Sequence, residues 1–225
     1  MKIVYMDPFF EIDLQKEKIN TVVIEVPELY SEFLENIWNQ MNGKEGKIHL
    51  SMEGNGLRLD RKVELIMNPF AVSCNERKIL NTIYSNLKSL AQDELIEEIT
   101  ELNLHIITFL DEVIAKEPYM LTYDLNLDIA GLLKLYNISV EEEYTDILDR
   151  LVTYLKLSHS VTGKELFVFY NLKNYLSERQ MCCLLEAAEY EQVMILNIEA
   201  NHKEIIKCFE SVNIIDKDYC IITIN

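Results

Sequence analysis

The sequence has few of the residues that form tight ligand-binding loops or covalent cross-links. Its 225 residues include six glycines, four prolines, one tryptophan and five cysteines. The cysteines are odd in number and form no CxxC pair, so neither a disulfide framework nor a zinc site is predicted. They are Cys74, Cys182, Cys183, Cys208 and Cys220. Unpaired thiols are typical of a reducing compartment, and we expect a cytoplasmic protein.

Positive charge is also scarce. The chain carries 21 lysine and arginine residues against 38 aspartate and glutamate residues, which gives a formal net charge of -17. Because such a surface repels a polyanion, the composition argues against indiscriminate nucleic-acid binding. This argument concerns the average surface, and a local basic groove would overturn it.

Long hydrophobic runs are absent as well. No uninterrupted apolar stretch approaches the roughly 20 residues that a membrane-spanning helix needs. The apolar start MKIVYMDPFF is broken by Asp7 and Pro8, which is unlike a signal peptide. We therefore expect no membrane partner.

A phosphate-binding loop is missing where the pattern would place one. Residues 21–38, TVVIEVPELYSEFLENIW, predict a buried strand that runs into an amphipathic helix. The junction carries Pro27 and Glu28, whereas a nucleotide site needs glycines and a lysine there. A second apolar strand, LFVFYN, ends in Asn171 instead of an acidic magnesium ligand. The four histidines have no partner at motif spacing, so we expect neither a bound nucleotide nor an enzyme.

Strand patterns occupy both ends of the chain and helical patterns occupy its middle. Short β-rich runs fill residues 1–26, and KIHLSMEGNGLRLD predicts a hairpin that turns at residues 54–56. Three apolar strands, LFVFY, VMILNI and YCIITI, follow the helices. The predicted fold class is α/β, with a discontinuous head domain, residues 1–70 and 140–225, and an inserted helical leg domain, residues 71–139.

The helical segments carry regular apolar stripes. One stripe alternates spacings of four and three, as in a heptad seam between paired helices. Its members are Leu95, Ile99, Leu102, Ile106, Phe109 and Val113. An ordinary long core helix gives the same pattern, and both interpretations remain open. A further long helix is predicted from Val140, and Ser177 with Gln180 has the spacing of a capping box.

One acidic segment suggests a metal site. In DLNLDIAG, Asp124, Asn126 and Asp128 occupy alternate positions, like the first half of an EF-hand loop. Ile129 and Leu135 stand where that loop needs glycine and glutamate, so the segment is not an EF-hand. Its oxygen atoms could hold a hard cation such as calcium, or an aspartate could cap the helix that follows.

Several segments, taken in order, resemble one known family. They are VELIMNPFAVSCNERKILNTIYSNL, LTYDLNLDIAGLLKLYNISVEE, DILDRLVTYLKLSHSVTGKELFVFYNLKNYLSERQM and DYCIITIN. Together they are similar to the accessory spacer-acquisition proteins of type II-A CRISPR systems. The similarity covers nearly the whole chain, and its specificity comes from the combination of segments.

The resemblance implies properties that the composition does not show. The family has a head that resembles P-loop NTPases without their nucleotide site, together with a helical leg. Four subunits form a ring that binds the ends of double-stranded DNA, and calcium orders the ring. The family acts beside the CRISPR integrase complex and the RNA-guided nuclease, without an established catalytic activity.

The resemblance also points to particular residues. Asp124 matches an acidic calcium-site candidate, whereas Asp128 rests on its spacing alone. Lys164 matches a basic turn and is a candidate DNA contact. Further candidates on head loops are Lys16, Lys18, Arg58, Arg61 and Lys62.

Two rival functions remain. A degenerate P-loop-like scaffold could assemble partner proteins without binding DNA. A nuclease could use Asp124 and Asp128 with a metal ion.

Overall fold

The computed structural model describes residues 1–206 and 209–224, and the chain divides into two compact units. The head unit comprises Met1–Cys74 and Glu142–Asn225, and the helical unit comprises Asn75–Glu141. The domain boundaries predicted from the sequence, after residues 70 and 139, fall within a few residues of these. Cys208 lies outside the described residues.

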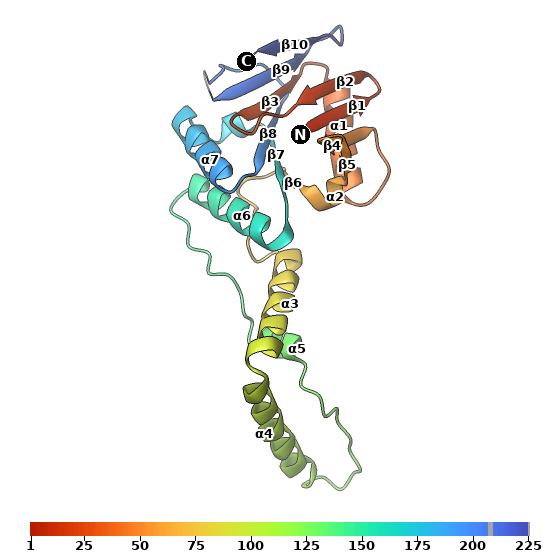
Figure 1. The fold of residues 1–225 in the computed structure, drawn as a ribbon, viewed down its shortest axis with the longest axis vertical. Coiled ribbons are helices and arrows are strands. Elements are labelled where there is room, and N and C mark those ends of the chain that lie inside the picture. Colours follow the sequence, from red (N-terminus) through yellow and green to blue (C-terminus); the bar gives the residue numbers. More distant parts are fainter. Residues whose placement is uncertain (207–208, 225) are drawn as a thin grey trace. The chain divides into compact units, whose positions relative to one another are not determined.

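The head unit is built on a six-stranded sheet with the order β10-β9-β3-β8-β7-β6 (Figure 1). The first five neighbouring strands from β6 to β9 pair in parallel, and β10 pairs antiparallel with β9. The bounds are β3 Ile19–Ile24, β6 Val63–Ile66, β7 Leu166–Tyr170, β8 Met194–Glu199, β9 Glu210–Ile215 and β10 Ile221–Ile224. Every residue of β3 and β8 is buried, which explains their nearly continuous apolar sequences.

A smaller antiparallel sheet, with the order β2-β1-β4-β5, belongs to the same unit. Its strands are β1 Lys2–Met6, β2 Phe9–Asp13, β4 Ile48–Met52 and β5 Asn55–Leu57. The predicted hairpin is present as β4 and β5, but its turn comes one residue earlier, at Glu53 and Gly54, which both have positive φ. Glycine adopts that conformation without strain.

Helix α1 (Pro27–Met41) joins the two sheets through a shared core. Its Leu29, Phe33 and Ile37 are buried against residues of both sheets. Phe33 also contacts the Tyr5 and Phe10 rings of the small sheet. The apolar stripe recognised in the sequence therefore packs the head.

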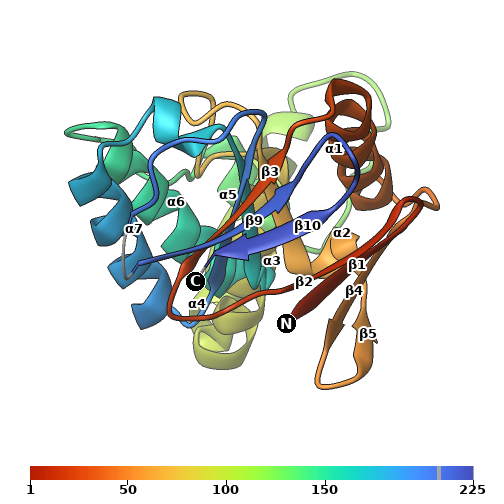
Figure 2. The same cartoon turned by 90° about the horizontal axis from the view of Figure 1, so that it is seen from above.

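Two helices, α6 (Ile147–Thr162) and α7 (Glu178–Tyr190), cover the opposite face of the large sheet (Figure 2). Helix α7 begins with the predicted capping box, in which Ser177 and Gln180 each bond the other's backbone. Helix α6 begins later than predicted, since Asp146 accepts a 2.8 Å hydrogen bond from the Asp149 amide and sets the first turn. The short η1 helix (Leu172–Asn174) follows β7, and α2 (Leu59–Lys62) precedes β6.

The strand β9 was not predicted from the sequence. Its residues ESVNII include three polar side chains, which hide the apolar pattern of a buried strand. Glu210 and Asn213 are nevertheless buried, and each has hydrogen-bond partners that compensate its polarity.

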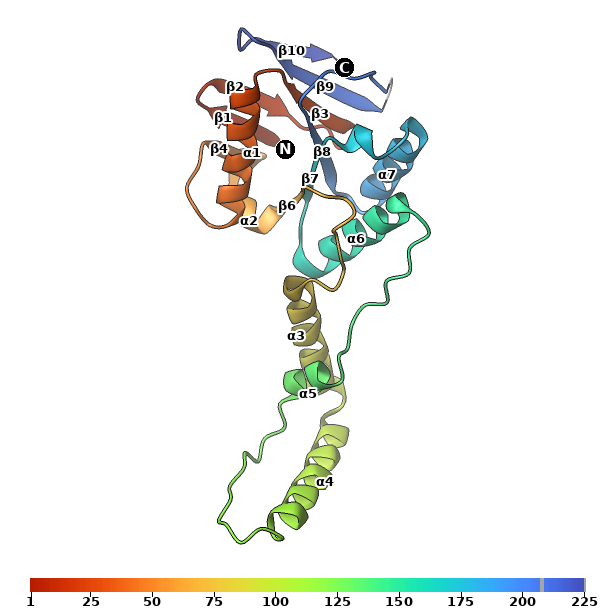
Figure 3. The same cartoon turned by 180° about the vertical axis from the view of Figure 1, so that it is seen from behind.

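The helical unit contains α3 (Arg77–Glu94), α4 (Ile96–Ile114) and α5 (Ile129–Leu135) (Figure 3). The Tyr84 hydroxyl of α3 donates a 2.7 Å hydrogen bond to the Ile138 carbonyl, and Lys134 of α5 lies over the Tyr84 ring. Helix α4 has no buried residue, although its sequence is strongly apolar. Its heptad stripe is therefore not the seam of a helix pair within one described chain.

The chain leaves the head and returns to it at closely held points. In the head unit, Glu142 accepts hydrogen bonds from the Ser73 hydroxyl and the Cys74 amide. In the helical unit, the Asn75 side chain donates to the Val140 carbonyl at 2.9 Å and accepts from the Val140 amide at 2.8 Å. Within each unit, the two crossing segments are thus tied side by side.

Among the described residues, the structure contains no helix that is both long and apolar enough to cross a membrane.

Candidate nucleic-acid interface

The six basic residues proposed from the sequence all lie just before strands of the large sheet. Lys16 and Lys18 precede β3, the α2 segment precedes β6, and Lys164 precedes β7. Because β3, β8, β7 and β6 are mutually parallel, their amino ends lie along one edge of the sheet. The structure therefore gathers residues that are far apart in the sequence along this amino edge.

Lys164 is buried, which corrects its prediction as a DNA contact. Only 1% of the residue is exposed. Its Nζ donates to the Asp60 carbonyl at 2.9 Å and to the Val63 carbonyl, and Glu64 Oε2 lies 3.7 Å away. The lysine thus ties α2 to the start of β6 and does not present its charge to a phosphate.

Two further candidates on the amino edge are neutralised by ion pairs. The Arg58 guanidinium holds Asp60 through two hydrogen bonds of 3.0 and 2.6 Å. Bonding from Arg58 lowers the pKa of the Asp60 carboxyl below its usual value. Lys62 pairs with Glu165. Both cations remain partly accessible, but their charge is largely compensated.

Three candidates, Lys16, Lys18 and Arg61, form no ion pair in the described part of the chain. Lys16 and Arg61 are exposed, and Lys18 is partly exposed. Lys16 lines an open pocket of about 430 Å³ together with Glu165, His159 and Gln192. Since Glu165 also pairs with Lys62, this pocket brings the β2–β3 turn and α2 together.

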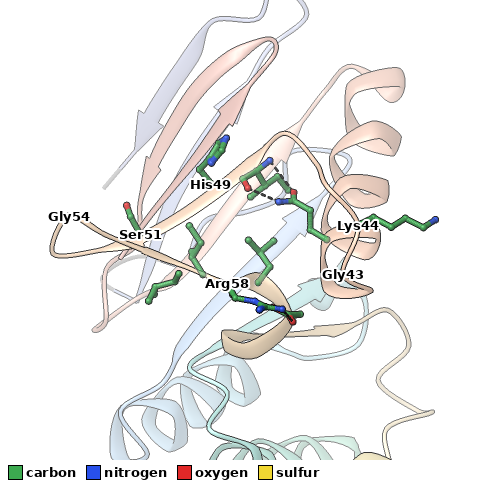
Figure 4. Close-up of a pocket in the computed structure, with 13 residues that line it drawn as sticks. Gly43, Lys44, His49, Ser51, Gly54 and Arg58 are labelled. Atoms are coloured by element: carbon green, nitrogen blue, oxygen red, sulfur yellow. Dashed lines mark hydrogen bonds and ion pairs between the residues drawn. The ribbon is translucent and has the colours of Figure 1, made fainter.

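A second pocket, of about 470 Å³, adjoins Arg58 and is shown in Figure 4. It is lined by the end of α1, the β4–β5 hairpin and the start of α2. In Figure 4 the Lys44 side chain extends away from the pocket, and Arg58 is already bound by Asp60. These two cations therefore do not make the pocket a phosphate site.

The opposite, carboxyl edge of the sheet is where open α/β folds bind ligands. Here Pro27 begins α1 directly after β3, and Glu28 lies in its first turn. The Tyr30 and Tyr170 rings, whose centroids are 5.8 Å apart, bridge the ends of β3 and β7. Burial and the neighbouring Tyr170 hydroxyl raise the pKa of Tyr30 well above its usual value. Aromatic side chains and a carboxylate thus occupy the region where a phosphate group would bind.

A buried polar network on the α7 face was missed by sequence reasoning. The Glu210 carboxylate accepts from the Thr21 hydroxyl and pairs with Lys173 at 2.7 Å. Glu199 pairs with Lys203 at 3.1 Å and accepts from Asn197 at 3.0 Å.

Each buried carboxylate in this network has its own lysine, so the network is an arrangement of structural ion pairs. The signal that could have revealed it is the polar pair Asn197 and Glu199 inside the apolar strand VMILNIE.

The proposed metal residues do not come together as a complete ligand set. The Asp124 carboxylate accepts a 3.0 Å hydrogen bond from the Asn126 amide. Asp128 stands at the N-cap position of α5 without a capping hydrogen bond from its side chain. Among the described residues, no three His, Cys, Asp or Glu side chains form a group that could hold a metal ion. One chain therefore does not fit a calcium ion by its side chains alone.

Comparisons with known proteins agree with this architecture. The crystal structure of Stu0660 of Streptococcus thermophilus matches with a TM-score of 0.61 and 15% sequence identity, over 100% of this chain and 76% of that chain. This likeness shows a shared fold. A putative ABC transporter ATP-binding protein from Pyrococcus furiosus matches with a TM-score of 0.38 and 12% identity, over 94% of this chain and 97% of that chain, which is too distant to support an argument.

The sequence itself identifies the family. No curated protein matches it. The family model described as CRISPR-associated protein (Cas_Csn2), however, matches residues 40–219, which is most of the chain. This match confirms the resemblance found in the sequence. The protein with a closed carboxyl edge and a basic amino edge belongs to the Cas_Csn2 family of CRISPR-associated proteins.

Proposed function

We propose that the protein binds double-stranded DNA, at its ends, during CRISPR spacer acquisition in the cytoplasm, and that it has no catalytic activity. Family membership supports the CRISPR role. The observation that supports DNA binding is the convergence of Lys16, Lys18 and Arg61 on the amino edge of the large sheet. These cations retain their charge, whereas their neighbours are paired.

The head is proposed to be a P-loop-NTPase-like fold that has lost its nucleotide site. The parallel strand order supports this relationship, and the β3–α1 junction explains the loss. Pro27 and Glu28 replace the glycines and lysine that close around phosphates. The tyrosine pair Tyr30 and Tyr170 fills the same edge.

An acidic chain can still bind DNA through a local basic surface. Exposed charges more than about 8–10 Å apart are largely screened at physiological salt, so distant carboxylates weaken such a surface little. We propose a ring of four copies, in which each basic position occurs four times. Contacts of this kind would be to phosphates, and they would carry little sequence preference.

The apolar face of α4 supports the proposed self-association. Leu95, Leu102, Phe109 and Val113 of the predicted seam are all exposed, and Phe109 is 63% exposed. A helix with an apolar stripe is stable in water when that stripe is buried against a partner. We propose that the partner is α4 of a second copy, as the heptad spacing favours helix pairs.

Calcium dependence is kept as a separate proposal. Asp124 and Asp128 are its candidate ligands, and calcium prefers six to eight oxygen atoms. Titration calorimetry with calcium chloride would measure binding directly. An Asp124→Asn variant is expected to weaken the binding, and unchanged binding would exclude Asp124 as a ligand.

The central experiment compares two charge-reversal variants with equal charge change. Lys16→Glu with Arg61→Glu alters the amino edge, whereas Arg179→Glu with Lys217→Glu alters exposed residues that follow the carboxyl ends of β7 and β9. Affinity for short linear duplexes is measured from about 50 to 200 mM salt. The amino-edge variant is expected to bind about tenfold or more weakly, with a shallower salt slope, because phosphate contacts are lost.

Two outcomes would contradict the proposal. If both variants lose affinity equally, net charge and not the amino edge governs binding. If the unaltered protein binds no duplex at low salt, the chain has another function.

A scaffold that assembles partner proteins without binding DNA is then the better explanation. The ion pairs of Arg58 and Lys62 and the exposed face of α4 favour that alternative.

A further inference from the structure

Strand β10 is the outermost strand of the large sheet. It follows β9 in the strand order, and its other side carries no strand among the described residues. All four of its residues, Ile221–Ile224, are exposed. The outer edge of such a strand presents backbone donors and acceptors to any chain that can pair with it.

The edge lacks the features that prevent pairing. Proteins protect exposed edges with lysine, proline or a β-bulge. The sequence IITI contains no charge and no proline, and its pairing with β9 is unbroken from Ile221 with Ile215 to Ile224 with Val212. Its isoleucines are 37–48% exposed, so they offer apolar surface as well as backbone groups.

We propose that β10 is a self-association edge, at which the β10 of a second copy adds in antiparallel orientation across a two-fold axis. Such an interface is isologous, so each residue of the strand faces the same strand of the partner. A charge in this strand would therefore meet like charge, which is destabilising in cross-strand pairs. In a chain with a net charge of -17, β10 is an uncharged strip that two copies can share.

The short length of β10 favours a second copy over an isolated peptide. A stable interface buries roughly 800 Å² on each partner, which a four-residue strand cannot reach alone. A peptide would therefore bind weakly. A copy that is already joined through α4 has a raised effective concentration, so a weak second contact can form.

This inference rests on the proposed self-association and completes it. One isologous interface produces only a dimer, whereas a tetramer with dihedral symmetry needs a second one. The exposed face of α4 in the helical unit supplies the first, and β10 in the head unit supplies the second. The two surfaces lie in different units, so they can be altered independently.

The test places opposite charges on the edge. Ile222 is 48% exposed, so I222K and I222E are expected to fold, which circular dichroism and the thermal midpoint check. Mass is measured by sedimentation velocity for the unaltered chain, for each variant and for their equimolar mixture. Each variant alone is expected to have about half the mass of the unaltered assembly, because like charges meet across the axis.

The mixture carries the decisive result. Opposite charges would then face each other, and the larger mass should return. An unaltered mass for I222K overturns the β10 proposal while the proposed self-association stands. A smaller mass that the mixture fails to restore also overturns it, since the loss then lacks the pairing specificity. An unaltered chain that is monomeric at every concentration overturns both.

Discussion

Lys164 and Arg61 carry the same charge on the same edge of the sheet, yet their surroundings give them different roles. Lys164 is enclosed by the Asp60 and Val63 carbonyls and by Glu64. Arg61 is exposed and has no ion pair in the described part of the chain. At the scale of single residues, burial therefore decides whether a cation stabilises the fold or is available to a ligand.

The first prediction follows from this contrast. Lys164→Ala leaves two buried carbonyls without a donor and should lower the free energy of unfolding by roughly 1–3 kcal/mol. Arg61→Ala removes an exposed side chain and should change it by less than about 0.5 kcal/mol. Denaturant titration of both variants measures the difference, and equal effects would contradict the assignment of Lys164.

The second prediction concerns alkaline pH. Burial, with the nearby Glu32 carboxylate, raises the pKa of Tyr5 to about 12. The folded protein therefore keeps a proton that the unfolded tyrosine loses near pH 10. The associated stability is complete below pH 10 and is lost as the pH rises through about 12.

Unfolding free energies from about pH 9 to 11.5 provide the measurement. Tyr5→Phe removes the titrating group and should give a shallower decline than the unaltered protein. Tyr30 and Tyr144 also have raised pKa values and remain in the variant, so part of the decline should persist. An identical decline in both proteins would show that Tyr5 does not contribute.

At the scale of elements, α7 shows how a local signal fixes a helix start. The Ser177 amide donates to Gln180 Oε1 at 3.1 Å, while the Gln180 amide donates to the serine hydroxyl. Ser177→Ala should cost about 1 kcal/mol of stability. Ser31→Ala in α1 is the control, because that hydroxyl only bonds the Pro27 carbonyl of its own helix. Thermal denaturation of the two variants should separate them, and equal midpoints would contradict the capping role.

Elements with strong local patterns were predictable from the sequence. The buried strands β3, β7 and β8 and the capping box of α7 all carry signals within a few residues. Strand β9 was missed because its burial depends on partners far away in the chain, such as Thr21 and Lys173 for Glu210. The start of α6 was placed too early because Tyr144 fits the helical stripe, yet its hydroxyl bonds Glu142 outside the helix.

The candidate site was predictable only in part. The sequence indicated which turns are basic, and the parallel strands bring those turns to one edge. It could not indicate which cations are already paired, because Lys62 meets Glu165 and Lys164 meets Val63 only after folding. Pairing between distant segments is a property of the tertiary structure and leaves no local pattern.

At the scale of the whole molecule, the exposed stripe of α4 should control assembly. Phe109→Asp places a charge in the centre of the proposed seam and should lower the mass in solution. Thr108→Asp adds the same charge at an exposed position beside the stripe, and it should leave the mass unchanged. Sedimentation velocity with circular dichroism checks mass and helix content together. Equal masses for the two variants would contradict a role for this face.

The closely held crossing points between the two units have a consequence for the history of the fold. Glu142 fixes the head segments beside each other, and Asn75 does the same for the ends of the helical unit. A segment whose two ends are neighbours can be inserted, lengthened or exchanged without redirecting the host chain. The helical unit therefore behaves as an exchangeable module, whose length can change between relatives while the head keeps its strand order.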